Sequence, residues 1–119
     1  MNRKPTLSKL TKRADGVFSL WIRKRDNGIC ICCGSRDNIQ CGHLIRRGRW
    51  SVRYHEDNCH AQCSRCNFKH NQYPDTMNVK VLAKIGAERF TTIYAESQVV
   101  KKKTRAELES IIQKYKEGI

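Results

Sequence analysis

"CICC" at residues 30–33 and "CSRC" at residues 63–66 are the two stretches that decide the fold of this 119-residue chain. Pairing Cys30 with Cys33 and Cys63 with Cys66 gives two C-x2-C motifs separated by a long spacer. This spacing lets both sulfurs of a pair face one ion across a tight turn, and two pairs supply four thiolates to a tetrahedral zinc. We therefore predict a structural zinc site at these four cysteines, whose binding energy contributes to folding.

Three further cysteines, Cys32, Cys41 and Cys59, lie outside these pairs. We interpret them as small buried apolar side chains, although Cys32 could compete as a zinc ligand. A redox role for "CICC" is disfavoured, because a redox C-x-x-C usually lies in a βαβ unit and the second pair indicates metal binding.

The charge balance indicates a polyanionic partner. Lysine and arginine number 24 against 11 acidic residues, giving a formal charge of +13, which favours a nucleic acid. The length is typical of one domain. No apolar run is long enough to span a membrane and no secretory or lipidation signal is evident, so we expect no membrane partner and a cytoplasmic location. Disulfides are rare there, which again favours metal binding by the seven cysteines.

The flanking regions are predicted to be helical. Residues 1–28 contain a basic amphipathic helix from Thr6 to about Asp26, in which Gly16 could be a weak point. Residues 75–119 form further helices, with a break at Gly86 and a capping box of Thr104 with Glu107. In the central residues 29–74, we predict strands over 38–44 and 50–55, a turn near Gly48, and a short helix after Cys63 that runs to about Asn71.

Five side chains that could act as acid–base groups or metal ligands lie between and just after the cysteine pairs: His43, Asn58, His60, Asn67 and His70. Taken singly, each is more typical of a structural residue than of a catalyst. Their order carries the argument, because His43, Asn58 and the segment "CSRCNFKH" resemble the HNH, or ββα-metal, nucleases. In that fold a β-hairpin delivers a general-base histidine, an asparagine braces the hairpin, and the next helix carries metal ligands.

A narrower resemblance covers about residues 28–95. The stretch "CGHLIRRGRWSVRYHEDNCHAQCSRCNFKHNQY", residues 41–73, followed by "LAKIGAERF", residues 82–90, is similar to the phage NinG/Rap recombination proteins. The most specific part is Asn-x-His-x-Gln-Cys-x2-Cys-Asn, which here begins at Asn58 and ends at Asn67. The resemblance implies an α+β fold in which a small zinc-stapled ββα-metal (HNH/treble-clef-like) core is flanked by helices. It also implies that residues 1–119 form a single nuclease domain.

The resemblance assigns roles residue by residue. His43 would be the base that activates water, Asn58 the bracing asparagine, and Asn67 and His70 the ligands of a catalytic Mg²⁺ or Mn²⁺. His60 has a counterpart in the family but receives no role. One departure concerns Gly42, because most HNH enzymes have a metal-binding Asp or His immediately before the base. The first coordination shell is therefore thin, and waters and phosphate oxygens would have to complete it.

We therefore expect a metal-dependent DNA endonuclease that acts on branched recombination intermediates such as Holliday junctions or D-loops. It could work as a homodimer, in the bacterial host cytoplasm if a phage encodes it. The alternatives are a non-catalytic zinc-stabilised nucleic-acid-binding adaptor and a plain HNH nicking endonuclease. Trp50 and Tyr54 could stack on an unpaired base or pack the core. The side chains expected to contact DNA are Arg46, Arg47, Arg49, Trp50, Arg53 and Lys69.

Overall fold

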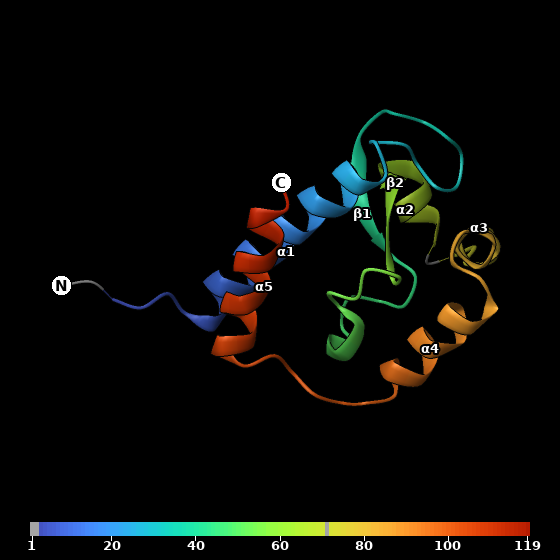
Figure 1. Cartoon of the computed structure of the whole chain (residues 1–119). Coiled ribbons are helices and arrows are strands. Elements are labelled where there is room, and N and C mark those ends of the chain that lie inside the picture. Colours follow the sequence, from blue (N-terminus) through green and yellow to red (C-terminus); the bar gives the residue numbers. More distant parts are fainter. Residues whose placement is uncertain (1–2, 71) are drawn as a thin grey trace.

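The computed structural model describes residues 3–70 and 72–119 and has a mixed α+β architecture (Figure 1). A small sheet lies between α1 and α5 on one side and α3 and α4 on the other. In the part of the chain that is described, no helix is long and apolar enough to cross a bilayer. The elements in chain order are α1 (Leu7–Arg25), β1 (Ile39–His43), the 3-10 helix η1 (Trp50–Val52), β2 (Cys59–Cys63), α2 (Ser64–His70), α3 (Asp75–Ile85), α4 (Ala87–Ser97) and α5 (Arg105–Glu117).

Helix α1 agrees with the predicted N-terminal helix. The Thr6 hydroxyl accepts a hydrogen bond from the backbone N–H of Lys9 (3.1 Å) and caps its start. Gly16 lies on the exposed side and does not interrupt the helix. Residues spaced four apart form the buried stripe that faces α5 and the sheet: Leu10, Ala14, Phe18 and Ile22. This spacing explains why the sequence pattern predicts the helix well.

The hairpin differs from the prediction in its second strand. Strand β1 agrees with the predicted first strand, but its antiparallel partner is Cys59–Cys63, with His43 opposite Cys59 and Ile39 opposite Cys63. The strand predicted over residues 50–55 is wrong, because residues 50–52 form η1. The cause lies in Asn58, whose side chain accepts from the Ile45 N–H (2.8 Å) and donates to the Ile45 and Val52 carbonyls (3.0 Å each). These bonds hold the loop as a compact turn and compete with strand pairing.

The C-terminal helices follow the predicted signals. Gly86 ends α3 and begins α4 with φ at +87°, a backbone conformation that glycine adopts readily. The predicted capping box at α5 is present, since Thr104 and Glu107 exchange both hydrogen bonds. On α3, Met77, Val81 and Ile85 are buried, whereas Leu82 is exposed.

Two apolar cores flank the sheet. The first joins α1 to α5 through Phe18, whose ring meets the rings of Tyr54 and Tyr115 edge to face. The second joins α3 and α4 to the hairpin loop, and it contains Met77, Val81, Ile85 and Ile93 with Leu44 and Val52. The loop between β1 and β2 thus contributes to both cores, which positions the end of β1 at His43.

Candidate functional site

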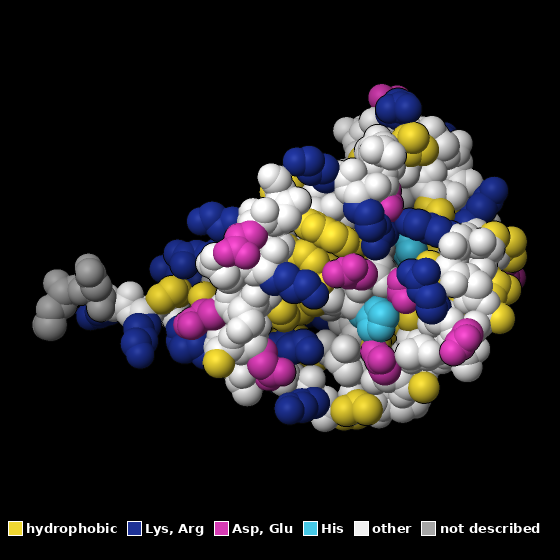
Figure 2. Space-filling model, in the orientation of Figure 1, with side chains coloured by type: hydrophobic (Ala, Val, Ile, Leu, Met, Phe, Trp, Pro, Cys, Tyr) yellow, Lys and Arg dark blue, Asp and Glu magenta, His cyan; other side chains and the backbone are white. Residues whose placement is uncertain are grey.

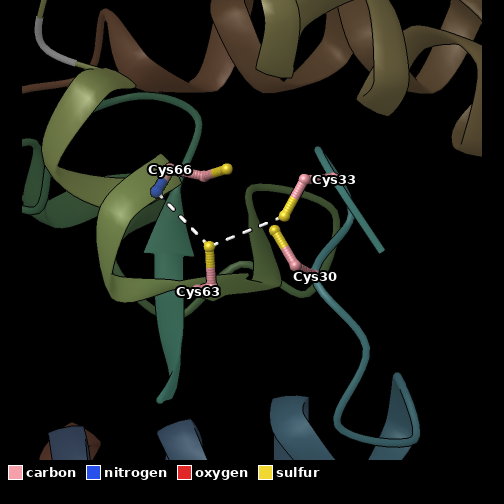
Figure 3. A group of neighbouring side chains, drawn as sticks. All are labelled: Cys30, Cys33, Cys63 and Cys66. Carbon is pink, nitrogen blue, oxygen red and sulfur yellow. Dashed lines mark hydrogen bonds between the residues drawn. The ribbon is translucent and has the colours of Figure 1, made fainter. Parts of the chain in front are cut away.

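The four predicted zinc cysteines converge at one point (Figure 3). Cys30 and Cys33 come from the loop after α1, Cys63 ends β2, and Cys66 lies in the first turn of α2. Their sulfurs all lie within 4.8 Å of one another, and the Cys33 and Cys63 sulfurs are 3.7 Å apart. Zinc bound tetrahedrally at Zn–S distances of about 2.3 Å separates its sulfurs by about 3.8 Å. The donor set and its spacing therefore fit a zinc ion.

The local backbone supports thiolates at this cluster. Burial raises the pKa of the Cys30 thiol, but the backbone N–H groups of Cys63, Cys33 and Cys32 outweigh this effect and lower the pKa to about 7. Burial and the neighbouring thiols raise the pKa of Cys66, because adjacent thiolates repel one another. A bound cation would remove that repulsion.

Cys32 does not belong to this cluster. Its sulfur accepts a hydrogen bond from the Gln62 side-chain amide (3.3 Å), and burial raises the pKa of its thiol. The group of four sulfurs that lie within 4.8 Å of one another does not include that of Cys32. From the sequence alone, Cys32 could have competed as a zinc ligand. Its contacts in the structure favour a packing role instead.

His43 lies at the end of β1 with its ring orientation fixed. Its Nε2 is 2.9 Å from the backbone carbonyl oxygen of Arg53, which can only accept, so Nε2 carries the proton and Nδ1 the lone pair. Burial lowers the pKa of His43, and the nearby charges of Arg47 and Arg53 act in the same direction. The imidazole is therefore neutral near pH 7 and able to accept a proton.

An open hollow of about 470 Å³, here called the His43 hollow, brings several predicted residues together. His43 and Arg47 line it from β1 and the following loop, and Asn67 and His70 line it from α2. Asn67 donates to the Gln40 side chain (2.9 Å), which leaves its carbonyl oxygen Oδ1 facing no hydrogen-bond donor among the described residues. His70 donates from Nε2 to the Leu44 carbonyl (3.0 Å), and its buried Nδ1 has no hydrogen-bond partner within residues 3–70 and 72–119.

Asn58 and His60 lie outside the His43 hollow. Asn58 is fully buried and acts on the loop through the bonds described above. His60 is also fully buried; its Nε2 donates to the Asp57 carbonyl (2.7 Å) and its Nδ1 accepts from Lys84 (2.9 Å). Burial, with the charge of Lys84, lowers the pKa of His60 to about 4. His60 therefore links α3 to the sheet as a neutral group.

The residues predicted to contact DNA divide into two sets. Arg46, Arg47 and Lys69 are exposed, and Arg49 is half-buried. Arg53 is buried, and its guanidinium binds both carboxylate oxygens of Asp15 (3.0 and 2.6 Å), so the structure does not support its predicted phosphate contact. Figure 2 shows one face of the molecule, where lysine and arginine side chains gather over the N-terminal part of α1.

Both aromatic residues of the loop pack against other side chains of the protein. The Arg53 guanidinium lies over the half-buried Trp50 ring, 4.2 Å from its centroid. Tyr54 is buried against Phe18, and its hydroxyl donates to Asp15 (2.8 Å). These contacts favour core packing over base stacking for Trp50 and Tyr54.

Replacing Asp15 with alanine is expected to destabilise the protein by about 3 kcal/mol, since it leaves the buried Arg53 charge unpaired. Asp15 is partly exposed, which places the effect at the lower end for such pairs. Urea unfolding followed by circular dichroism measures the change. Glu109→Ala, at an exposed position on α5, is the matched control and should alter stability by less than about 0.5 kcal/mol. Equal effects of the two substitutions would contradict a structural role for the Asp15–Arg53 pair.

The absence of a side chain at Gly42 has a structural cause. Gln62, on β2, is 1% exposed and lies against Gly42, where an added Cβ would be 2.0 Å from its Oε1 atom and 3.0 Å from its Cβ. The Gln62 Oε1 atom has no hydrogen-bond partner among the described residues. Gln62 thus fills the space beside the hairpin where an acidic side chain at position 42 would begin.

Gly42→Ala is accordingly expected to destabilise the protein by roughly 1–3 kcal/mol through overpacking against Gln62. Thermal unfolding measures the effect, with Gly48→Ala as control, because nothing lies within 4 Å of a Cβ at that exposed position. The double substitution Gly42→Ala with Gln62→Ala should show favourable coupling relative to the two single changes. Additive effects would show that contact with Gln62 is not the reason for the glycine.

Sequence reasoning missed three residues at or near the site: Asp15, Gln62 and Phe68. Asp15 is the partner of Arg53 across 38 positions, a separation that no local pattern reveals. Phe68 is 73% exposed on α2 and lines the His43 hollow. Its position as an apolar residue between Asn67 and His70, the two predicted metal ligands, was a sequence signal that could have identified it.

Taken together, fold and site define a class: a basic α+β protein with a four-cysteine cluster that could bind zinc beside a histidine-containing hollow. A family model described as "Bacteriophage Lambda NinG protein" matches residues 2–119, and the chain belongs to that family. No curated protein and no solved structure matches the chain significantly.

Proposed function

We propose that this protein is a metal-dependent DNA endonuclease of the HNH type. The observation that carries the proposal is the shared lining of the His43 hollow, where a neutral, oriented histidine faces the same space as Asn67, His70 and Arg47. The order of β1, β2 and α2, with the four-cysteine cluster at the junction of β2 and α2, is the order of a ββα-metal core. A substrate phosphate bound in this hollow would meet a base and a cation on opposite walls.

His43 acts as the general base. The Arg53 carbonyl holds its Nε2–H, so Nδ1 is the atom that takes a proton from the attacking water. Asn58 fixes the same loop that carries Arg53, and it thereby maintains the orientation of the imidazole. The two apolar cores and the cysteine cluster keep β1 aligned with α2, which preserves the distance between base and metal ligands.

Asn67 Oδ1 and His70 Nδ1 are the atoms that would hold the divalent ion. The Nδ1 of His70, which has no hydrogen-bond partner among the described residues, fits this role, because a buried imidazole nitrogen without a hydrogen-bond donor is available as a ligand. An amide oxygen and an imidazole suit Mn²⁺ as well as Mg²⁺, with waters in the remaining positions. When bound, the ion would neutralise charge on the scissile phosphate and its leaving oxygen.

DNA binding uses the exposed basic side chains around the hollow. Arg47 lines it directly, and Arg46 and Lys69 are exposed on the adjoining loop and on α2. Phe68, which is also exposed at this wall, could stack on an unpaired base, as expected for a branched substrate. We propose recombination intermediates as the substrate class; paired cuts across a junction would require two copies of the chain.

A second candidate function is a zinc-stabilised DNA-binding adaptor without catalysis. It is favoured by one observation: no carboxylate is among the described residues that line the His43 hollow. Gln62, which fills the space beside Gly42, carries no charge and would neutralise no metal ion. The adaptor shares the basic surface and the cysteine cluster with the nuclease and differs only in the chemistry of the hollow.

The deciding experiment incubates labelled four-way junction, flap and linear duplex with the protein in Mg²⁺, Mn²⁺ or EDTA. The nuclease predicts cleavage with either metal and none in EDTA, and the junction should be cut fastest. Equal cutting of all three substrates would indicate a plain nicking endonuclease. Tight binding without cleavage of any substrate would overturn the proposal in favour of the adaptor.

Substituting Arg46 or Arg47 with alanine should weaken DNA binding and reduce its salt dependence. Each lost phosphate contact lowers the slope of log K against log salt concentration by about 0.9. Fluorescence anisotropy between about 50 and 200 mM salt measures the slope. Lys116→Ala, on α5 and outside the His43 hollow, should leave the slope unchanged. A slope that responds equally to all three substitutions would argue against a specific phosphate contact near the hollow.

A further inference from the structure

A second group of metal-ligating side chains surrounds His43. The Cys41 and Cys59 sulfurs and a ring nitrogen of His43 all lie within 4.8 Å of one another. The pairing of β1 with β2 causes this, since His43 is directly opposite Cys59 and Cys41 is two residues away on the same face of the sheet. The group is separate from the four-cysteine cluster, with which it shares no residue.

We infer that Cys41, His43 and Cys59 form a binding site for one soft divalent cation, of which Zn²⁺ is the natural representative. Two thiolates and one imidazole are a donor set that zinc accepts, with a water in the fourth position. The Arg53 carbonyl already receives the Nε2–H of His43, which is the second hydrogen bond that metal-bound histidines usually make. Binding displaces the thiol protons of Cys41 and Cys59 to solvent.

The site can be reached by an ion. Cys59 is fully buried, whereas Cys41 and His43 are half-buried and line both the His43 hollow and an adjoining hollow of about 260 Å³. An ion can therefore enter from the hollow and meet Cys41 and His43 first. The two sulfur donors discriminate against Mg²⁺, which prefers oxygen ligands, and in favour of Zn²⁺.

The consequence for activity rests on the proposed function. A cation bound to the imidazole of His43 takes the one lone pair that the base needs, so zinc at this second site inhibits cleavage that Mg²⁺ or Mn²⁺ supports. Zinc thus has opposite effects at the two clusters: it stabilises the fold at one and blocks His43 at the other. The metal site itself does not depend on the proposed function.

The test adds Co²⁺, as a spectroscopic probe for zinc, to the full chain purified with zinc at its four-cysteine cluster and kept reduced. A thiolate-to-cobalt absorption band that saturates at about one equivalent per chain supports the site. Cys41→Ala should weaken cobalt binding by more than about 100-fold, because a direct ligand matters at least as much as a second-shell group. Cys32→Ala is the control, since Cys32 belongs to neither cluster, and it should retain the band. Any band that remains in Cys41→Ala measures exchange of cobalt into the four-cysteine cluster.

A wild-type band no larger than that of Cys41→Ala would overturn the inference. A second experiment measures the cleavage rate of each variant with and without added Zn²⁺, and each rate is compared with the same variant's zinc-free rate. Inhibition by zinc should be weaker in Cys41→Ala than in Cys32→Ala. A cobalt band without any cleavage in Mg²⁺ or Mn²⁺ supports the metal site and refutes the nuclease. Cleavage without a Cys41-dependent band supports the nuclease and refutes the metal site.

Discussion

His43→Ala is expected to lower the rate of phosphodiester cleavage by about 10²–10⁴-fold while DNA affinity stays within about twofold of wild type. The imidazole supplies the proton acceptor for water, and alanine cannot replace it. The backbone at the end of β1 tolerates alanine, because His43 contacts the loop through a single side-chain bond to the Arg53 carbonyl. Single-turnover cleavage of a labelled junction measures the rate, and anisotropy measures the affinity.

The control for this experiment is His55→Ala, which removes a histidine outside the His43 hollow that pairs with Glu96 (3.1 Å). Cleavage by that variant should remain near the wild-type rate. In the wild type, the acidic limb of the pH–rate profile should lie below pH 6.5, because burial lowers the pKa of His43 and the base stays unprotonated to lower pH. Undiminished cleavage by His43→Ala would exclude this residue as the base.

Loss of the four-cysteine site is expected to unfold the central part of the protein. A structural zinc contributes an apparent free energy of about 10–16 kcal/mol, which is as large as the whole stability of an ordinary domain. The cluster connects the loop after α1 to β2 and α2, so Cys63→Ser releases three elements at once. The expected result is loss of the cooperative thermal transition, which circular dichroism monitors. Elemental analysis should find less than one zinc per chain.

Cys32→Ser provides the comparison for Cys63→Ser, because it removes a thiol from the same loop without touching the cluster. It should keep one tightly held zinc and a melting temperature within a few degrees of wild type. A Cys63→Ser protein that melts like the wild type without zinc would show that the two apolar cores alone sustain the fold.

The parts of the fold that depend on neighbouring residues were predictable from sequence. Helix α1, the break at Gly86 and the capping box at Thr104 follow from local spacing and backbone preference. The C-x2-C pairs determine their own local turns, so the convergence of the four cysteines could also be predicted. In each case the cause acts between residues that are close in the sequence, so it does not depend on the tertiary fold.

Other features depended on contacts between distant residues. Residues 50–55 have the alternation of a strand, but Asn58 binds their backbone into a turn and β2 forms at residues 59–63 instead. The sequence predicted Arg53 to be part of a basic surface, yet Arg53 is buried and its guanidinium binds the carboxylate of Asp15 on α1. Gln62 explains Gly42 only once β1 and β2 are paired.

By itself, then, the sequence determined the helices, the cysteine cluster and the excess of positive charge. Tertiary structure alone decided which strand pairs with β1, which basic groups stay exposed, and which side chains face His43. The physical reason is that local spacing sets backbone conformation through short-range bonds. Burial and partner choice result from long-range packing, in which a buried charge such as Arg53 must find its counterion wherever the fold places one.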